Sequence, residues 1–163
     1  MTDTTAEISI NDKDVREELS GTVSGASAAS ITKNQTMPSV DAWLKEAKND
    51  ENAGRIGMYL THNGVVRSTA KAAARMGEKD TKPVVGLYFA YDTEKVSQAI
   101  EKTREMEGIH YVRVWLNEGQ LSVGDDIMLV LIGGDIRPRV IDALQALVSE
   151  IKTECVVETE IYE

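Results

Sequence analysis

Residues 127–152, IMLVLIGGDIRPRVIDALQALVSEIK, join an apolar segment to an amphipathic one through a Gly-Gly turn. Residues 127–132 are all apolar, which predicts a central strand covered on both faces. Pro138 suits the first turn of a helix, and the apolar residues from Val140 to Ile151 then form one stripe on that helix. A strand and a helix of this kind must pack against further elements, and the flanking sequence supplies them.

The segments on either side of this unit predict the rest of an α+β fold. Strands are predicted over 84–91, 110–116 and 155–162, and a helix over 92–106. From Val84 the order is β-α-β-β-α-β, the split βαβ arrangement with two helices on one face of an antiparallel sheet. Residues 62–83 and 117–125 are expected to be loops.

An extra helix and strand precede this core. Ser39 is a suitable N-cap, and Val40, Trp43, Leu44 and Ala47 then lie on one helical face. A strand is expected over 55–61.

The first 36 residues differ in composition from the rest. Residues 20–36 are almost entirely small or polar, so they bury too little apolar surface to offset the entropy of ordering them. We therefore predict a flexible tail over 1–36 and a folded body over 37–163.

Composition excludes several classes of function. The chain carries 18 Lys and Arg against 27 Asp and Glu, a net charge of −9, which argues against binding to nucleic acid or to an anionic membrane surface. Cys155 is the single cysteine, so no intrachain disulfide forms and no multi-cysteine metal site is expected. His62 and His110 are interpreted as structural or solvent-facing, and Cys155 as a buried, inert thiol. We expect no metal, no cofactor, no membrane span and no signal peptide, hence a cytoplasmic protein.

The segment 62–83 is locally basic in this acidic chain. It contains Arg67, Lys71 and Arg75, with Lys79 and Lys82 further on. If residues 68–77 are helical, the first three line one face at four-residue spacing and suit a phosphate or a carboxylate. The alternative is a solvated surface loop whose charges offset the acidic remainder of the chain.

Two further cations are open to two interpretations each. Lys152 ends the long helix, where it either interacts with the helix dipole or points into a pocket as an acid, base or nucleophile. Arg137 begins the same helix and either holds an anion there or pairs with Asp135. The sequence contains none of the phosphate-loop, dinucleotide or nucleophile-elbow motifs.

Several short motifs, in order, resemble the MoaE family, the large subunit of molybdopterin synthase. GVVR at 64–67 is similar to the family's G-x-V-R, and GQLSVGDD at 119–126 to its G-x-L-x-x-G-[DE]-x. Ile136-Arg137 lies where the family has His-Arg, and Ile151-Lys152 resembles its L-K. The resemblance covers about residues 38–160.

The resemblance implies an α/β hammerhead fold and a homodimer that binds a small MoaD-like sulfur carrier, giving a heterotetramer. The implied reaction moves sulfur from the carrier's C-terminal thiocarboxylate onto cyclic pyranopterin monophosphate. Lys152 would then be the reactive lysine, and Arg67, Arg137, Lys71 and Arg75 would bind anionic groups of the substrate and the carrier.

The sequence also departs from the family. Thr159 stands about where the family has a second lysine, and Leu116-Asn117 replaces another His-Arg pair. Either Lys152 therefore acts with a loop residue such as Lys71, Arg75 or Lys79, or catalysis is lost. Two alternatives stay open: a non-catalytic MoaE-fold module that binds a MoaD-like protein or a pterin, and an unrelated split βαβ domain that senses a small anion.

Overall fold

The computed structural model describes residues 35–79 and 81–163. Residues 1–34 of the predicted tail therefore lie outside the described residues. Gln35, the first described residue, exchanges hydrogen bonds with the side chain of Asn117. The helices are α1 Val40–Ala47, α2 Lys71–Met76, α3 Thr93–Arg104 and α4 Arg137–Glu150, with a 3₁₀ turn η1 Ala53–Arg55 and a π-helical turn η2 Ile151–Cys155. The strands are β1 Met58–Val65, β2 Val84–Tyr91, β3 Ile109–Leu116, β4 Gly119–Ser122, β5 Asp126–Gly134 and β6 Val156–Tyr162.

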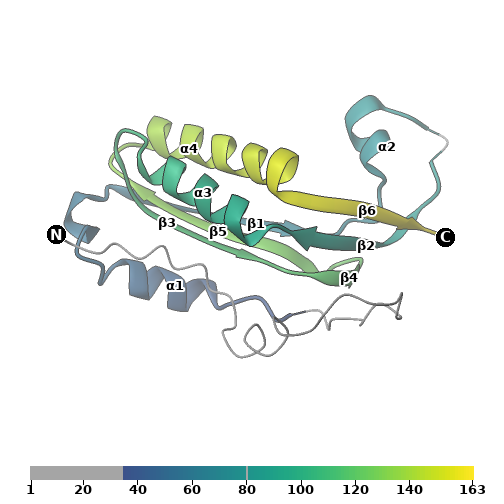
Figure 1. Ribbon diagram of the computed structural model, residues 1–163, viewed down its shortest axis with the longest axis horizontal. Coiled ribbons are helices and arrows are strands. Elements are labelled where there is room, and N and C mark those ends of the chain that lie inside the picture. Colours follow the sequence, from purple (N-terminus) through teal and green to yellow (C-terminus); the bar gives the residue numbers. More distant parts are fainter. Residues whose placement is uncertain (1–34, 80) are drawn as a thin grey trace, which may run out of the picture.

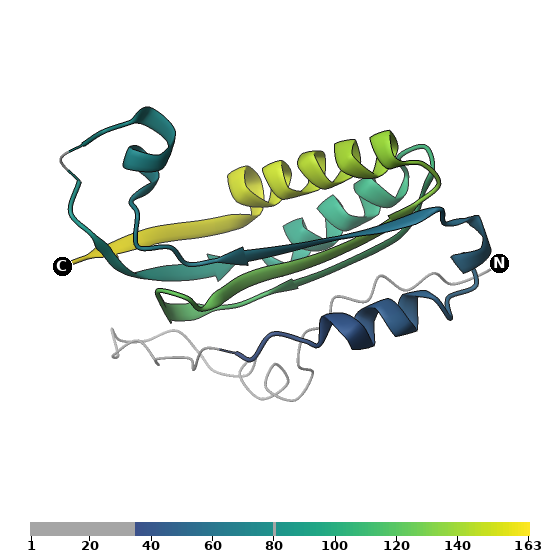
Figure 2. The ribbon, with the colours of Figure 1, turned by 180° about the vertical axis from the view of Figure 1, so that it is seen from behind.

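The strands form two antiparallel sheets, with strand orders β1-β5-β3 and β4-β2-β6. Helices α3 and α4 lie side by side over one face, and α1 lies on the opposite side of the β1-β5-β3 sheet (Figures 1 and 2). Helix α2 stands apart from the other helices, at the end of the molecule formed by β2 and β6. The predicted α+β class, with a split core and an extra helix and strand before it, is confirmed.

Strand β5 is the centre of the fold. Met128, Val130 and Ile132 face the main core, which also contains Leu147 and Ile151. Leu129 and Leu131 face a second core with Trp43, Ala47 and Trp115 beneath α1. Because alternate residues from Met128 to Ile132 enter two different cores, each of these positions must be apolar. The continuous apolar run therefore correctly predicted that this strand is central and covered on both faces.

The helix starts follow their expected caps. The Ser39 side chain accepts a hydrogen bond from the Ala42 amide, and the Asp92 side chain accepts from the amides of Glu94 and Lys95. Each cap satisfies amides that the first helical turn leaves unpaired.

Three predicted boundaries are wrong. The first strand begins at Met58 rather than 55 and continues to Val65, because β5 extends far enough to pair with it throughout. Residues 117–125, predicted as a loop, contain β4, whose four residues pair with β2. The loop expected over 62–83 contains a helix, and it is shorter than the one considered over 68–77: it runs from Lys71 to Met76, and Gly77 ends it with a positive φ of 69°.

Candidate anion-binding cleft

A cleft lies where α2 meets the ends of β1 and β6 and the turn after α4. Its volume is about 80 Å³. Apolar side chains from β1, β2 and β5 form its floor, and charged side chains from α2, η2 and β6 form its walls. The lining residues are Val65, Val66, Arg67, Lys71, Arg75, Val84, Leu87, Ile127, Lys152, Glu158 and Glu160.

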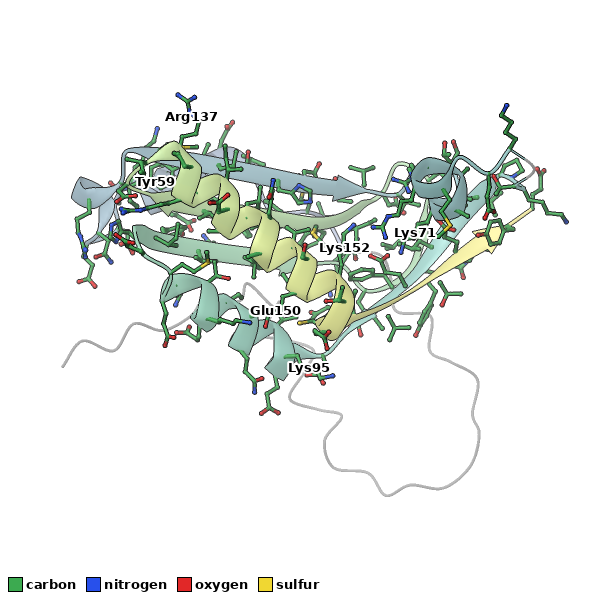
Figure 3. The ribbon with its side chains drawn as sticks, turned by 90° about the horizontal axis from the view of Figure 1, so that it is seen from above. Tyr59, Lys71, Lys95, Arg137, Glu150 and Lys152 are labelled. Atoms are coloured by element: carbon green, nitrogen blue, oxygen red, sulfur yellow. The ribbon has the colours of Figure 1, made fainter. Side chains whose placement is uncertain are left out.

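Four of the five predicted site residues line this cleft. Arg67 lies two residues after the end of β1, and its Nε donates to the Thr69 carbonyl at 3.0 Å. Lys71 and Arg75 are four residues apart on α2, so they share one face of that helix. Lys152 reaches the cleft from the opposite side, and Figure 3 shows Lys71 and Lys152 near each other. The basic segment and the last helix, far apart in sequence, therefore meet here.

Lys152 lies in the π-helical turn η2. Its neighbour Ile151 is fully buried and Cys155 is 4% exposed, so this turn is anchored in the core while Lys152 is exposed. Within the described part of the chain, Lys152 forms no hydrogen bond or ion pair. The turn thus presents an uncommitted amino group to the cleft.

His62 on β1 is electrostatically coupled to Lys152. Burial, and then the positive charge of Lys152, lower the pKa of the His62 imidazole below its usual value. Both effects favour the neutral form of the half-buried ring. This proximity could not be read from the sequence, because ninety residues separate the two positions.

Two carboxylates in the cleft were not predicted from the sequence. Glu158 forms an ion pair with the Lys71 ammonium group, and its side chain is 8% exposed. Glu160 accepts a hydrogen bond from the Lys71 amide at 2.9 Å and another from the Tyr162 hydroxyl at 2.7 Å. The alternation of β6 could have indicated that both acids share one face, but not which face.

The same alternation affects Thr159. Because Glu158 and Glu160 face the cleft, Thr159 between them lies on the other face of β6, where it is exposed. The position that resembles the family's second lysine is therefore directed away from the cleft in this chain.

Arg137 does not line this cleft. It begins α4, and its side chain lies at the opposite end of that helix from Lys152 (Figure 3). Fifteen residues at about 1.5 Å each separate the two positions by about 22 Å. The prediction that Arg137, Arg67 and Lys152 share one pocket is therefore not met within a single chain, because the helix is too long.

The remaining candidate groups stay outside the cleft. Cys155 is buried as predicted, and burial, with the Glu150 carboxylate, raises the pKa of its thiol, which disfavours the reactive thiolate. Across residues 35–79 and 81–163, no three His, Cys, Asp or Glu side chains form a group able to hold a metal ion. No helix in these ranges is both long and apolar enough to cross a membrane.

Solved structures share this architecture at low sequence identity. Molybdopterin synthase from Staphylococcus aureus superimposes with a TM-score of 0.55 at 18% identity, covering 67% of this chain and 77% of that one. A complex of subunits 1 and 2 of molybdopterin-converting factor from Helicobacter pylori gives 0.54 at 16% identity, covering 76% of each chain. Molybdopterin cofactor biosynthesis protein E from Burkholderia multivorans gives 0.54 at 18% identity, covering 77% of this chain and 82% of that one. Identities this low show the fold alone.

The family match is independent of these superpositions. No curated protein matches the sequence. The family model described as MoaE protein matches residues 34–154, which run from before α1 into the π-helical turn that carries Lys152. Since this match spans most of the chain, the protein belongs to the MoaE family.

Proposed function

We propose that this chain acts in molybdenum cofactor biosynthesis as the catalytic subunit of a molybdopterin synthase. In the proposed reaction, sulfur passes from the thiocarboxylate of a MoaD-like carrier protein to cyclic pyranopterin monophosphate. The observation that carries this proposal is the cleft, which gathers Arg67, Lys71, Arg75 and Lys152 in a chain of net charge −9. Membership of the MoaE family supports the same role.

The cations suit the two reactants. The substrate carries a cyclic phosphate, and the carrier brings a negatively charged tail. Guanidinium groups bind such anions through paired hydrogen bonds, so we assign Arg67 and Arg75 to binding. We assign Lys152 to the reacting group, because it is exposed and, within the described residues, uncommitted. Once the sulfur has bonded to the pterin, water attacks the acyl carbon, the carbon–sulfur bond breaks and the carrier tail leaves as a carboxylate; the ammonium group would stabilise the negative charge that develops on the acyl oxygen in this step.

The size of the cleft bears on assembly. Its volume of about 80 Å³ is well below the roughly 300 Å³ at which pockets for complete small-molecule ligands begin. One chain therefore surrounds only part of the substrate. We propose that a second copy and the carrier tail complete the site, in a cytoplasmic heterotetramer of two chains and two carriers. Arg137, distant from the cleft of its own chain, would bind an anion only in such an assembly.

One observation favours a second candidate function. Thr159 faces away from the cleft, and Lys71 is neutralised by Glu158. Only Lys152 then remains as an available amine among the described cleft residues. A non-catalytic module that binds a MoaD-like protein or a pterin without sulfur transfer is consistent with this reduced set.

A reconstituted transfer assay separates the two candidates. The full chain is mixed with a thiocarboxylated MoaD-type carrier and cyclic pyranopterin monophosphate, and molybdopterin is measured. Lys152→Ala is expected to abolish product while carrier binding persists. Lys95→Ala is the matched control, because it removes an equal charge from an exposed position of α3, outside the cleft (Figure 3). Carrier binding without product in the wild type would establish the binding module instead.

A further inference from the structure

The ammonium group of Lys71 is already occupied by a carboxylate of the chain itself. Glu158 forms its ion pair from within the cleft, where its side chain is 8% exposed, while the side chain of Lys71 is 39% exposed. A carboxylate with so little access to water depends on its partner for compensation of its charge. The pair lies at the position where an anionic ligand would meet Lys71.

Helix α2 depends on these contacts for its placement. It has six residues, none of them buried, and its N-cap Ala70 provides no side-chain hydrogen bond. Helices this short are unstable in isolation. The contacts of Lys71 with Glu158 and Glu160 join its first turn to β6. Moving Lys71 therefore moves one wall of the cleft.

We propose that Glu158 determines which ligands the cleft accepts, because its carboxylate occupies Lys71 until the anionic group of a ligand replaces it. This inference rests on the proposed function only in requiring that the cleft bind an anion. The ligand chemistry is a phosphate or a terminal carboxylate. Arg75 and Lys152 are free of ion pairs within the described residues, so an entering anion contacts them first and then competes for Lys71.

The exchange favours ligands with more negative charge than the Glu158 carboxylate. A phosphate presents several acceptor oxygens to Lys71 and its neighbours at once, whereas a ligand carboxylate only replaces the carboxylate of Glu158 with another carboxylate. Glu158 thus selects for the phosphate-bearing reactant over a simple carboxylate tail.

The test is a double-mutant cycle on the full chain. Wild type, Glu158→Gln, Lys71→Ala and the double variant are titrated calorimetrically with inorganic phosphate. Glu158→Gln is expected to tighten phosphate binding about fivefold, the upper range for a partly exposed ion pair. In the Lys71→Ala background the same change is expected to alter binding less than about twofold, because no cation remains to be released. A second titration uses an acetylated peptide ending in Gly-Gly, which the wild type is expected to bind more weakly than phosphate.

The matched control is Glu154→Gln, which makes the same charge change at an exposed neighbouring residue outside the lining of the cleft. It is expected to change phosphate binding less than about twofold. An equal gain in both backgrounds would show simple repulsion and overturn the proposal. So would an equal gain in the control, weaker binding in Glu158→Gln, a wild type that binds the peptide as tightly as phosphate, or no phosphate binding in any variant.

A second variant keeps the test decisive if Glu158→Gln does not fold. Glu158→Asp retains the charge but shortens the reach to Lys71, and is expected to tighten phosphate binding about twofold; unchanged or weaker binding would overturn the proposal. The titration needs neither carrier nor turnover. A chain that passes it but transfers no sulfur would refute the proposed function alone.

Discussion

Substitutions at two adjacent residues of η2 are expected to affect the stability and the function of the chain separately. Ile151 is fully buried in the main core, whereas Lys152 is exposed. Ile151→Ala removes three carbon atoms, worth about 0.8 kcal/mol each in transfer free energy, and leaves a cavity in addition. The expected loss is about 3 kcal/mol. Lys152→Ala removes no buried surface, so its effect on unfolding should stay within about 0.5 kcal/mol.

Urea denaturation of the full chain measures both effects. With a slope of about 2 kcal/mol per molar urea, Ile151→Ala should lower the midpoint by about 1.5 M at unchanged slope. Ile151→Val, which removes one carbon atom, should lower it by about 0.5 M. Lys152→Ala should leave the midpoint in place while abolishing the sulfur transfer proposed above.

The reasoning fails if the two variants shift the midpoint equally. It also fails if Ile151→Ala shifts it by less than about 0.5 M, because the turn would then not be anchored in the core.

Contacts and electrostatics support three further predictions. Lys152→Ala should raise the pKa of His62, which proton NMR titration measures; an unchanged pKa of His62 would contradict the proximity of the two residues. Because the folded-state pKa of His62 is lowered, the unfolded chain binds this proton more readily, so stability should fall as the pH drops below about 6.5. His62→Gln should flatten that part of the denaturation profile, and identical profiles would refute the assignment. Gly86→Ala places a Cβ 2.7 Å from the Leu121 carbonyl oxygen. It should therefore destabilise the chain by about 1–3 kcal/mol, measured by thermal unfolding. An unchanged melting temperature would show that the sheet relaxes freely around the added methyl group.

Local signals in the sequence predicted most of the fold correctly. The apolar run 127–132 predicted the doubly covered strand, because burial on both faces leaves no position for a polar residue. Ser39 and Asp92 predicted helix starts, because their side chains cap amides within three residues. Strand β4 was missed, because its four residues are held by pairing with β2, a partner remote in sequence.

Only the positively charged residues of the candidate site could be predicted from the sequence. Lys71 and Lys152 were identified from local charge and from a resemblance, and neither signal depends on the fold. Glu158 was not identified, since its role depends on which face of β6 meets α2. Arg137 was assigned to the same pocket on the resemblance, although the length of the helix between it and Lys152 keeps the two apart.

The π-helical turn η2 also determines how the chain tolerates insertions and deletions between α4 and β6. Hydrogen bonds in such a turn span one residue more than those of an α-helix, so η2 accommodates an additional residue. Deleting one residue there would restore an ordinary α-helical turn and leave α4 and β6 in place, whereas deleting one residue at the start of β6 would move every later side chain to the other face of the strand. The acidic face of β6 would then leave the cleft, and the side chain of Thr159 would enter it. Members of this family that differ in length by one residue are therefore expected to keep the same cleft when the change lies in η2, and to present the other face of their last strand to it when the change lies in β6.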